Sequence, residues 1–389
     1  YDREREVAIS AVIQASIITR HLSTSLKLSI DNEQKHSNDQ TTITKTDNSP
    51  VTIGDFTVQG LINLLISKKF PNDRIIAEES SKDLIKSNKG TKITTTDQDQ
   101  IRSKVLETLN FGLNQTRLDV TEDEWNWKDL RSLRLNQTDW MSVIDHGNVC
   151  DEDYVGSEEE FDERFNRFWT LDPIDGTKGF LRGQQYSICL SLIINGRVQL
   201  GVIAAPNLPI HSKIFPGDCP DQDRSDTGLV FVAERDQGTY QRTFDSGELR
   251  RLSMNENDCL ESLINNNGRF CESYESSHSD HSLTSRIIST IGLKDHQPIR
   301  VDSQVKYCLI SRGDGDIYLR YPTRSDYHEK IWDHAPGSII VEEAGGRVSD
   351  FDGKDLLFFN RKNLRTMSNN RGIVACKREL HPDLIRIIK

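Results

Sequence analysis

The segment YSICLSLIINGRVQLGVIAAP, residues 186–206, constrains the fold more than any other part of the chain. Two runs rich in β-branched and other apolar residues flank the dipeptide Asn195-Gly196, which is typical of a tight hairpin turn. We therefore predict a β-hairpin here. After a polar connection, the run GLVFVAE at 228–234 begins a further series of strands and helices.

Strands and helices alternate on both sides of this hairpin. Before it, residues 4–22 and 56–70 carry apolar side chains at helical spacing, and residues 74–77 are predicted as a short strand. After it, the sequence predicts three helices and three strands, namely helices at 280–293, 303–313 and 332–346 and strands at 298–302, 316–322 and 347–351. This mixture indicates layered α and β structure rather than a helical bundle or a β-sandwich.

Residues from about 81 to 165 differ from the rest of the chain in composition. They are polar, rich in Asp, Glu, Asn and Thr, and include the acidic run GSEEEFDE. We predict one helix at about 101–113 and a mobile or lineage-specific insertion around it, with the acidic run as a solvated loop. We expect two halves, 1–227 and 228–389, that form one compact unit.

The charge and cysteine content exclude several classes of function. The net charge is −11 with Lys and Arg scattered, whereas binding to a DNA or RNA duplex needs a clustered basic face. The seven cysteines never form a CxxC pair, which favours buried thiols in a reducing compartment over a disulfide framework or a cysteine zinc site. No apolar run approaches the ~18–20 residues that a membrane span needs. We expect a cytoplasmic monomer; a plastid or mitochondrial location stays open because the chain begins without Met.

Acidic residues recur at the ends of predicted elements. Asp172 and Asp175 stand three apart in FWTLDPIDGTKGF, where an apolar run gives way to glycine and threonine. Buried carboxylates this close repel one another and lose hydration, so they need a compensating cation. Asp55 and Asp333 stand at predicted helix starts, where each taken alone is a typical cap, and Glu78 follows a predicted strand. As a set of hard oxygen ligands, the five carboxylates favour Mg²⁺.

The residues around this aspartate pair suit an anion. Pro173 fixes the backbone between the aspartates, so a rigid turn could aim both side chains and the Ile174 carbonyl at one place. The run Gly176-Thr177-Lys178-Gly179 can bring backbone N–H groups close to an anion, because glycine permits near approach. Together they suit a metal-bridged phosphate. The spacing alone is equally compatible with a tight turn that carries an aspartate cap.

The block DPIDGTKGF at 172–180 resembles the signature of the inositol-monophosphatase-like, lithium-sensitive phosphatase superfamily. Its partner blocks follow the same order: GD at 54–55, EES at 78–80 and WDHAPG…EEAGG at 332–346. The resemblance implies a layered αβαβα sandwich of the sugar-phosphatase type. Within the superfamily, VDSQVKYCLISRGDGDIYLRYP at 301–322, together with ESSHSDH and EKIWDH, is similar to the 3′(2′),5′-bisphosphate nucleotidases.

This resemblance implies a substrate class and a biological role. Such enzymes hydrolyse adenosine 3′,5′-bisphosphate to AMP and phosphate, act on 3′-phosphoadenylyl sulfate, and in some cases act on inositol 1,4-bisphosphate. It implies a small nucleotide bisphosphate as the partner, inhibition by Li⁺, and roles in sulfate assimilation, nucleotide detoxification and salt tolerance. Two alternatives remain: an inositol-phosphate 1-phosphatase, against which VDSQVKYC argues, and a non-catalytic nucleotide sensor, against which the complete ligand set argues.

The resemblance also implies two Mg²⁺ sites. Glu78, Asp172 and the carbonyl of Ile174 would hold one ion. Asp172, Asp175 and Asp333 would hold the second, with Asp172 shared between them. Two such ions can activate a water and stabilise the leaving oxygen of an in-line displacement.

Further roles follow from the same resemblance. Asp55 and Thr177 would orient and polarise the attacking water, and a third, loosely held Mg²⁺ would lie near Asp55. The backbone N–H groups of Gly176 and Thr177 would hold the scissile phosphate. Four residues would surround the adenosine and its 5′-phosphate: His278, Ser303, Lys306 and Arg320.

Overall fold

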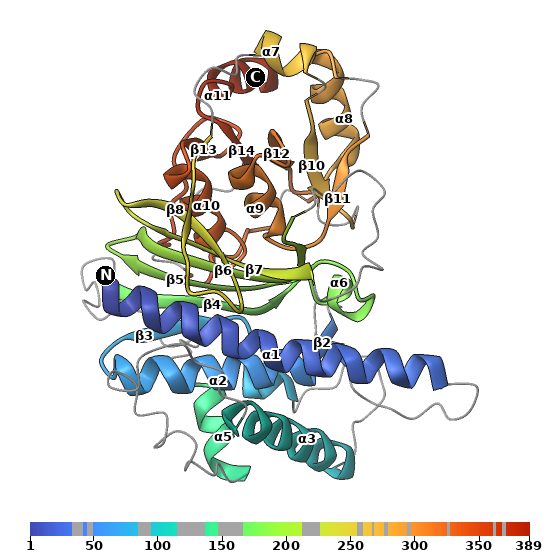
Figure 1. The fold of residues 1–389 in the computed structure, drawn as a ribbon, viewed down its shortest axis with the longest axis vertical. Coiled ribbons are helices and arrows are strands. Elements are labelled where there is room, and N and C mark those ends of the chain that lie inside the picture. Colours follow the sequence, from blue (N-terminus) through green and yellow to red (C-terminus); the bar gives the residue numbers. More distant parts are fainter. Residues whose placement is uncertain are drawn as a thin grey trace.

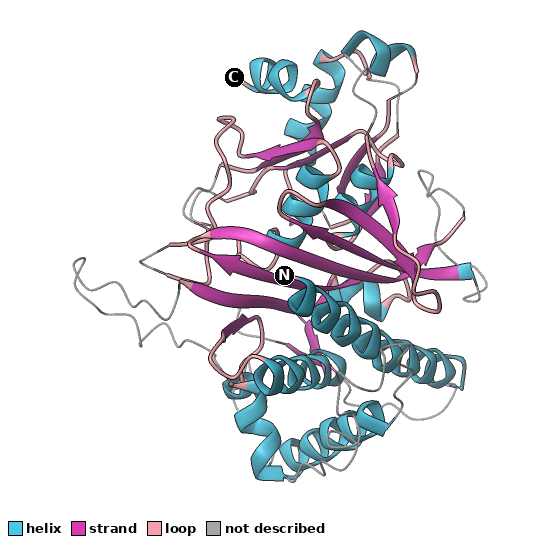
Figure 2. Cartoon of the chain, turned by 60° about the vertical axis from the view of Figure 1, so that its left-hand side comes forward, coloured by secondary structure: helices cyan, strands magenta, loops and turns pink. Residues whose placement is uncertain are grey.

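The computed structural model describes residues 1–32, 42–44, 50–84, 95–114, 137–146, 166–211, 226–254, 260–266, 268–275, 279–293, 297–324, 327–360, 363–367 and 371–389. Within these ranges the elements form layers in the order helices, sheet, helices, sheet, helices, from the bottom of Figure 1 to its top. Figure 2 shows the two large sheets edge-on, with helices between them. The predicted αβαβα layering is confirmed.

The first sheet has seven strands in the order β3-β4-β5-β6-β7-β8-β9. Their bounds are β3 (Arg74–Ala77), β4 (Arg167–Asp175), β5 (Ser187–Ile194), β6 (Arg197–Pro209), β7 (Thr227–Glu234), β8 (Gly238–Thr243) and β9 (Arg250–Leu252). Strands β3 and β4 run parallel, and the later neighbours run antiparallel. The predicted hairpin is confirmed as β5 and β6, joined by Asn195 and Gly196, which both have positive φ as a tight hairpin turn requires.

Helices α1 (Asp2–Asn32) and α2 (Ile53–Lys69) cover one face of this sheet, and α3 (Thr95–Asn114) and α5 (Gln137–Ile144) pack against α2 (Figure 1). The short pair β1 (Thr42–Thr44) and β2 (Pro50–Thr52) precedes α2, and a 3-10 turn, η1 (Ser81–Leu84), follows β3. These elements confirm the helices predicted in the first 114 residues. Most of the predicted insertion, including its acidic run, lies outside the described residues.

The second sheet has five strands in the order β11-β10-β12-β14-β13. Their bounds are β10 (Phe270–Ser273), β11 (Ile299–Val301), β12 (Ile317–Arg320), β13 (Gly346–Ser349) and β14 (Ile373–Lys377). Helices α9 (Val305–Arg312) and α10 (Ala335–Glu343) lie between the two sheets. The outer face packs against three helices, α7 (Leu260–Asn265), α8 (His281–Thr290) and α11 (His381–Ile388).

Strands β7 to β9 belong to the first sheet, although we assigned residues from 228 onward to the second half. The two sheets divide between the end of β9 at Leu252 and the start of β10 at Phe270. The polar connection before residue 228 suggested a boundary, but β7 returns antiparallel along β6, with Val232 opposite Val202. A polar stretch in the sequence therefore joins two paired strands here.

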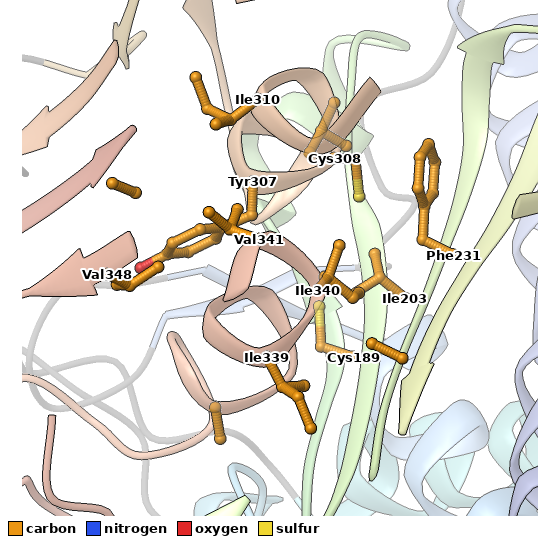
Figure 3. Close-up of a cluster of buried hydrophobic side chains, with 14 of the residues drawn as sticks. Cys189, Ile203, Phe231, Tyr307, Cys308, Ile310, Ile339, Ile340, Val341 and Val348 are labelled. Carbon is orange, nitrogen blue, oxygen red and sulfur yellow. The ribbon is translucent and has the colours of Figure 1, made fainter. Parts of the chain in front are cut away.

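Both faces of the first sheet are buried. Along β5, Leu190 and Leu192 belong to the core shared with α1 and α2, whereas Cys189 and Ile193 belong to the core shared with α9 and α10. Figure 3 shows this second core, in which side chains of the sheet meet those of the two middle helices: Cys189, Ile203 and Phe231 against Tyr307, Cys308, Ile339 and Ile340. A sheet covered on both faces explains why the hairpin sequence is apolar throughout rather than alternating.

The described part of the chain agrees with two expectations from composition. Among the helices that the structure describes, none combines the length and apolarity that a bilayer-spanning helix needs. The four cysteines in the described ranges, Cys189, Cys271, Cys308 and Cys376, are buried free thiols. Burial raises the pKa of Cys271 to about 12, so this thiol is protonated at neutral pH.

Gly201 on β6 lies where α10 packs directly against the sheet. A methyl group there would lie 2.5 Å from Cγ2 of Ile339 and 2.8 Å from the carbonyl oxygen of Pro336. We expect Gly201→Ala to lower the free energy of unfolding by about 1–3 kcal/mol, because the helix must shift to make room. Urea denaturation followed by circular dichroism measures the difference. Gly247→Ala is the control, since a methyl group there meets nothing within 4 Å; equal stability of the two variants would contradict this packing.

Candidate active site

Strand β4 carries a one-residue bulge between Asp172 and Asp175. Asp172 pairs with Cys189 of β5 and Asp175 with Ser187, so three steps along β4 span two steps along β5. Pro173, which has no N–H to donate, lies inside the bulge. Because side chains alternate along a strand, the extra residue brings two aspartates that are three apart to the same face. The side chains of Ser187 and Cys189 accordingly lie 3.3 Å and 3.9 Å from Oδ2 of Asp175.

Glu78 lies beside Asp172 because β3 and β4 are parallel. Ala77 pairs with Leu171, and the N–H of Glu78 donates to the carbonyl oxygen of Leu171 at 3.1 Å. The next residues along the two strands are Glu78 and Asp172, which therefore lie at the same carboxyl-terminal edge. Arg365 donates to the carbonyl oxygen of Glu78 at 2.8 Å and ties a segment of the second half to this edge.

Asp55 is both the N3 residue of the capping box that begins at Thr52 and a member of the acidic group. Its Oδ2 accepts from the backbone N–H of Thr52 at 2.7 Å and from the Thr52 hydroxyl at 2.6 Å, which completes a capping box at the start of α2. The side chain is fully buried. Its charge also contributes to the raised pKa of Asp172. A capping role therefore does not remove Asp55 from the carboxylate cluster.

Gln304 joins Asp175 to the segment that carries Asp333. Its backbone N–H donates to Oδ2 of Asp175 at 2.5 Å. Its side-chain amide donates to the carbonyl of Trp332 at 2.7 Å and accepts from the N–H of Gly337 at 3.0 Å. Sequence reasoning missed this residue. It lies in the quoted block VDSQVKYC, but its role depends on a bond to a residue 129 positions away, which no local pattern reveals.

Asp172 lies at the centre of the acidic cluster. Burial raises its pKa well above the usual value, and four neighbouring charges raise it further: those of Glu78, Asp175, Asp333 and Asp55. Its Oδ1 is buried and accepts no hydrogen bond from the residues that the structure describes. A buried carboxylate oxygen without a donor needs a cation beside it. The residues present therefore fit a divalent cation bound by oxygen ligands.

Asp175 and Asp333 face basic side chains as well as acidic ones. Burial raises the pKa of Asp175 to about 6, although the charge of Lys306 and the N–H of Gln304 oppose it. Burial also raises the pKa of Asp333, although Arg320, whose Nη2 lies 3.7 Å from Oδ2 of Asp333, opposes it. A cluster of carboxylates bordered by cationic side chains suits a cation that itself binds an anion.

The glycine-rich run after β4 is pressed against the second half of the chain. Helix α6 (Thr177–Leu181) follows Gly176, which has φ of +84°. A methyl group on Gly176 would lie 3.1 Å from the Cβ atoms of Asp302 and Ser303. A methyl group on Gly179 would lie 2.2 Å from the carbonyl oxygen of Gln185. Glycine suits both positions, because Gly176 has positive φ beside the turn before α9 and Gly179 packs between that turn and the Gln185 carbonyl.

Thr177 and Ile174 contact each other across this turn. The hydroxyl of Thr177 donates to the carbonyl oxygen of Ile174 at 3.1 Å. The predicted pairing of Thr177 with Asp55 therefore competes with a bond to the predicted metal-ligand carbonyl. That pairing stays a prediction.

Three of the four residues predicted to contact the nucleotide are described: Ser303 precedes α9, Lys306 lies in its first turn, and Arg320 ends β12. Ser303, at φ of +68°, accepts at its hydroxyl from the N–H of Val305 at 3.2 Å. Lys306 is buried, and its Nζ donates to the carbonyl oxygens of Val301 and Ser303 at 3.1 and 2.6 Å. Burial lowers the pKa of Lys306 to about 8, although Asp175 opposes this. His278 lies outside the described residues. Their nucleotide contacts stay predictions.

A cavity of about 470 Å³ lies apart from the acidic cluster. It opens where α9 ends and β12 begins, and its lining includes Ser253, Ser311, Arg312, Asp316 and Lys377. Two of the predicted site residues lie at the other ends of these two elements: Ser303 precedes α9, and Arg320 ends β12. The cavity therefore contains none of them.

Residues 142–389, which include β4 and every later element, match the sequence profile of the inositol monophosphatase family. The chain belongs to this family. A protein of Schizosaccharomyces pombe named 3′(2′),5′-bisphosphate nucleotidase is 37% identical over 99% of this chain and 94% of its own length. An Arabidopsis thaliana protein named 3′,5′-bisphosphate nucleotidase 2 is 34% identical over 89% of this chain and 87% of its own length. The resemblance drawn from the sequence blocks is confirmed.

Solved structures of inositol monophosphatases share the fold. Thermotoga maritima IMPase superimposes with a TM-score of 0.53 at 19% sequence identity, covering 100% of this chain and 97% of its own. Inositol monophosphatase from Anabaena gives a TM-score of 0.52 at 15% identity, covering 100% and 95%. At these identities the comparison establishes the inositol-monophosphatase fold alone.

The raised carboxyl pKa values predict how the metal-free protein responds to pH. A carboxyl group whose pKa is raised on folding stabilises the protein below its unfolded pKa of about 4, and this contribution is lost as pH rises through the folded pKa. We expect metal-free Asp172→Asn to be more stable than wild type at pH 8, by on the order of 1 kcal/mol, with the difference vanishing toward pH 4. Thermal unfolding in EDTA across this range measures it.

Asp236→Asn is the matched control for this pH series. Asp236 is exposed and has φ of +65°, a conformation that asparagine also adopts readily. We expect its stability to follow that of wild type at every pH. An Asp172→Asn protein less stable than wild type at pH 8 in EDTA would contradict the repulsion inferred for the cluster.

Proposed function

We propose that this chain is a Mg²⁺-dependent phosphatase that converts adenosine 3′,5′-bisphosphate to AMP and phosphate. The observation that carries the proposal is the buried cluster around Asp172, whose Oδ1 has no hydrogen-bond donor among the described residues. Relatives that match most of this chain are named bisphosphate nucleotidases. Burying or half-burying five carboxylates together lowers the stability of the fold, and a purely structural role does not offset this loss. Catalysis with a bound cation accounts for that cost.

The chain would hold the cation through oxygen atoms of its first sheet and of the segment before α10. Glu78, Asp172 and the Ile174 carbonyl form one candidate ligand set, and Asp175 and Asp333 extend it to a second ion through Asp172. A bound divalent ion supplies charge for the phosphate oxygens and lowers the pKa of a water ligand. This donor set contains only hard oxygen atoms, which favours Mg²⁺ over zinc.

The remaining roles fall to groups of the chain itself. Asp55, fixed at the start of α2 by its two bonds to Thr52, would orient the attacking water and accept a proton from it. Thr177 would assist through its hydroxyl, which is a poor base without a carboxylate or a metal beside it. The backbone N–H groups of Gly176 and Thr177, at the start of α6, would hold the scissile phosphate.

The nucleotide part of the substrate would bind against the second half. We assign His278, Ser303, Lys306 and Arg320 to the adenosine and its 5′-phosphate. Guanidinium and ammonium groups are suited to phosphate. We extend the proposal to 3′-phosphoadenylyl sulfate as a second substrate and to a role in sulfate assimilation. Residence in the cytoplasm belongs to the same proposal.

Phosphate release from two substrates tests this function. We expect the protein to release phosphate from adenosine 3′,5′-bisphosphate faster than from inositol 1-phosphate in Mg²⁺, and from neither in EDTA. Asp172→Asn should lower the rate by about 100-fold or more, since several kcal/mol of charge stabilisation depends on the cation that Asp172 would hold. A colorimetric phosphate assay measures all four conditions.

The outcomes separate the competing functions. Faster release from inositol 1-phosphate would replace the nucleotidase by an inositol-phosphate phosphatase on the same site. Release from neither substrate, with a nucleotide that still binds, would favour the sensor. Asp236→Asn serves again as the control and should keep the wild-type rate.

Lithium gives a second test of the proposed metal ligands. Li⁺ is a hard cation that accepts oxygen ligands, but it carries half the charge of Mg²⁺ and stabilises phosphate less. We expect millimolar LiCl to inhibit phosphate release, whereas NaCl at the same concentration leaves it unchanged. Inhibition should weaken as Mg²⁺ is raised if both ions use the Asp172, Asp175 and Asp333 set. Full activity in LiCl would refute that assignment.

A further inference from the structure

Arg320 at the end of β12 lies closer to Glu329 than to the acidic cluster. Its Nε donates to Oε1 of Glu329 at 2.9 Å, and its Nη2 lies 2.7 Å from Oε2. The two side chains are 13% and 1% exposed. Burial opposes the charge of Glu329, but Arg320 and a bond from His334 outweigh it and lower the pKa of Glu329 to about 2. Glu329 is thus a permanent anion whose main partner is Arg320.

His334 and Tyr307 fix Glu329 from the other side. Nε2 of His334 lies 3.0 Å from Oε2 of Glu329, and Nδ1 lies 2.8 Å from the hydroxyl of Tyr307. A carboxylate only accepts hydrogen bonds, so Nε2 of His334 is the donor to Glu329. Every group in this chain has a partner, which gives the carboxylate one position.

Arg320 also lies near the acidic cluster. Its Nη2 is 3.7 Å from Oδ2 of Asp333, against 2.7 Å from Glu329. A guanidinium in direct contact with Asp333 would compete with a cation for that carboxylate. In the present geometry Arg320 forms only a long ion pair with Asp333, about one ångström longer than its contact with Glu329.

A second group of possible metal ligands lies nearby. One ligand atom each from Glu329, Asp333 and His334 lies within 4.8 Å of the other two. The contacts argue against an ion there. Glu329 and His334 already bond to each other, and Arg320 occupies the remaining side of Glu329. A cation among them would face a guanidinium. Glu329 therefore acts through Arg320 and not as a ligand.

We propose that Glu329 is a positioning residue that keeps Arg320 from a close contact with Asp333 and so keeps Asp333 available to a divalent cation. This inference rests on the proposed metal site. It goes beyond that proposal because Glu329 itself touches neither the cation nor the substrate.

Mn²⁺ binding measured without turnover tests the proposal. Isothermal titration calorimetry with Mn²⁺ compares wild type with Glu329→Gln, which keeps the shape of the side chain and removes its charge. We expect the variant to bind Mn²⁺ at least about tenfold more weakly, because the released Arg320 pairs with Asp333 and that pair must break. The double variant Glu329→Gln/Arg320→Gln should return to within about threefold of wild type.

The double variant separates positioning from ligation. If Glu329 were itself a ligand, the double variant would bind as weakly as Glu329→Gln, and this would overturn the proposal. Unchanged affinity in Glu329→Gln would overturn it as well. If Glu329→Gln fails to fold, the double variant still decides, because it buries no unpaired charge and its affinity relative to wild type carries the same meaning.

The control is Glu342→Gln. Glu342 on α10 also pairs with an arginine, Arg235, at 2.9 Å, but this pair lies outside the acidic cluster. We expect wild-type Mn²⁺ affinity in this variant. A wild-type protein that binds no Mn²⁺ would refute the proposed metal site itself, whereas binding that is equal in wild type and Glu329→Gln would refute only the role of Glu329.

Discussion

Repulsion among buried carboxylates is the constraint on which the rest of this structure depends. Asp172 lies in a buried environment with four other acidic groups, and its Oδ1 accepts no hydrogen bond from the described part of the chain. Such a cluster destabilises a chain that lacks a cation, so the surrounding fold must be rigid enough to keep the groups together. The two covered sheets supply that rigidity. One-residue precision comes from the bulge of β4, which turns Asp172 and Asp175 to the same side.

The cluster also joins the two sheets. Asp172 lies on β4 and Glu78 follows β3, both of the first sheet, whereas Asp333 precedes α10, which lies between the two sheets. Gln304 connects them, since its backbone bonds Asp175 and its side chain holds the segment from Trp332 to Gly337. The close packing of Gly176 against the turn before α9 connects the same two parts of the chain. Binding of a cation would therefore stabilise the contact between the two sheets as well as the cluster itself.

The sequence predicts the local features of this site well and the long-range ones poorly. Asn195-Gly196 identifies the hairpin because the turn chemistry is local. The carboxylates themselves could be named because they stand at element ends within quoted blocks. The bulge could not be predicted from the sequence. Pro173 shows that one backbone N–H is missing from β4, but it does not show which residues of β5 pair with Asp172 and Asp175. Gln304 escaped for a similar reason, since its partners lie far away in the sequence. The polar connection before residue 228 was misleading because composition does not reveal strand pairing.

Basic residues beside the acidic cluster compete with a metal ion for the carboxylates. A phosphatase site needs positive charge for its substrate, yet each cation near the carboxylates competes with the metal for them. In this chain both basic groups are restrained by neutral or acidic partners: Lys306 by two backbone carbonyls and Arg320 by Glu329. Each is thus held at a fixed position by these bonds. The hydrogen-bond chain from Tyr307 through His334 to Glu329 places polar groups in the protein interior, which costs desolvation free energy. A requirement for Arg320 at one position explains why the chain keeps them. Placement of these cations, and not their number alone, lets one site accommodate a metal and a phosphate together.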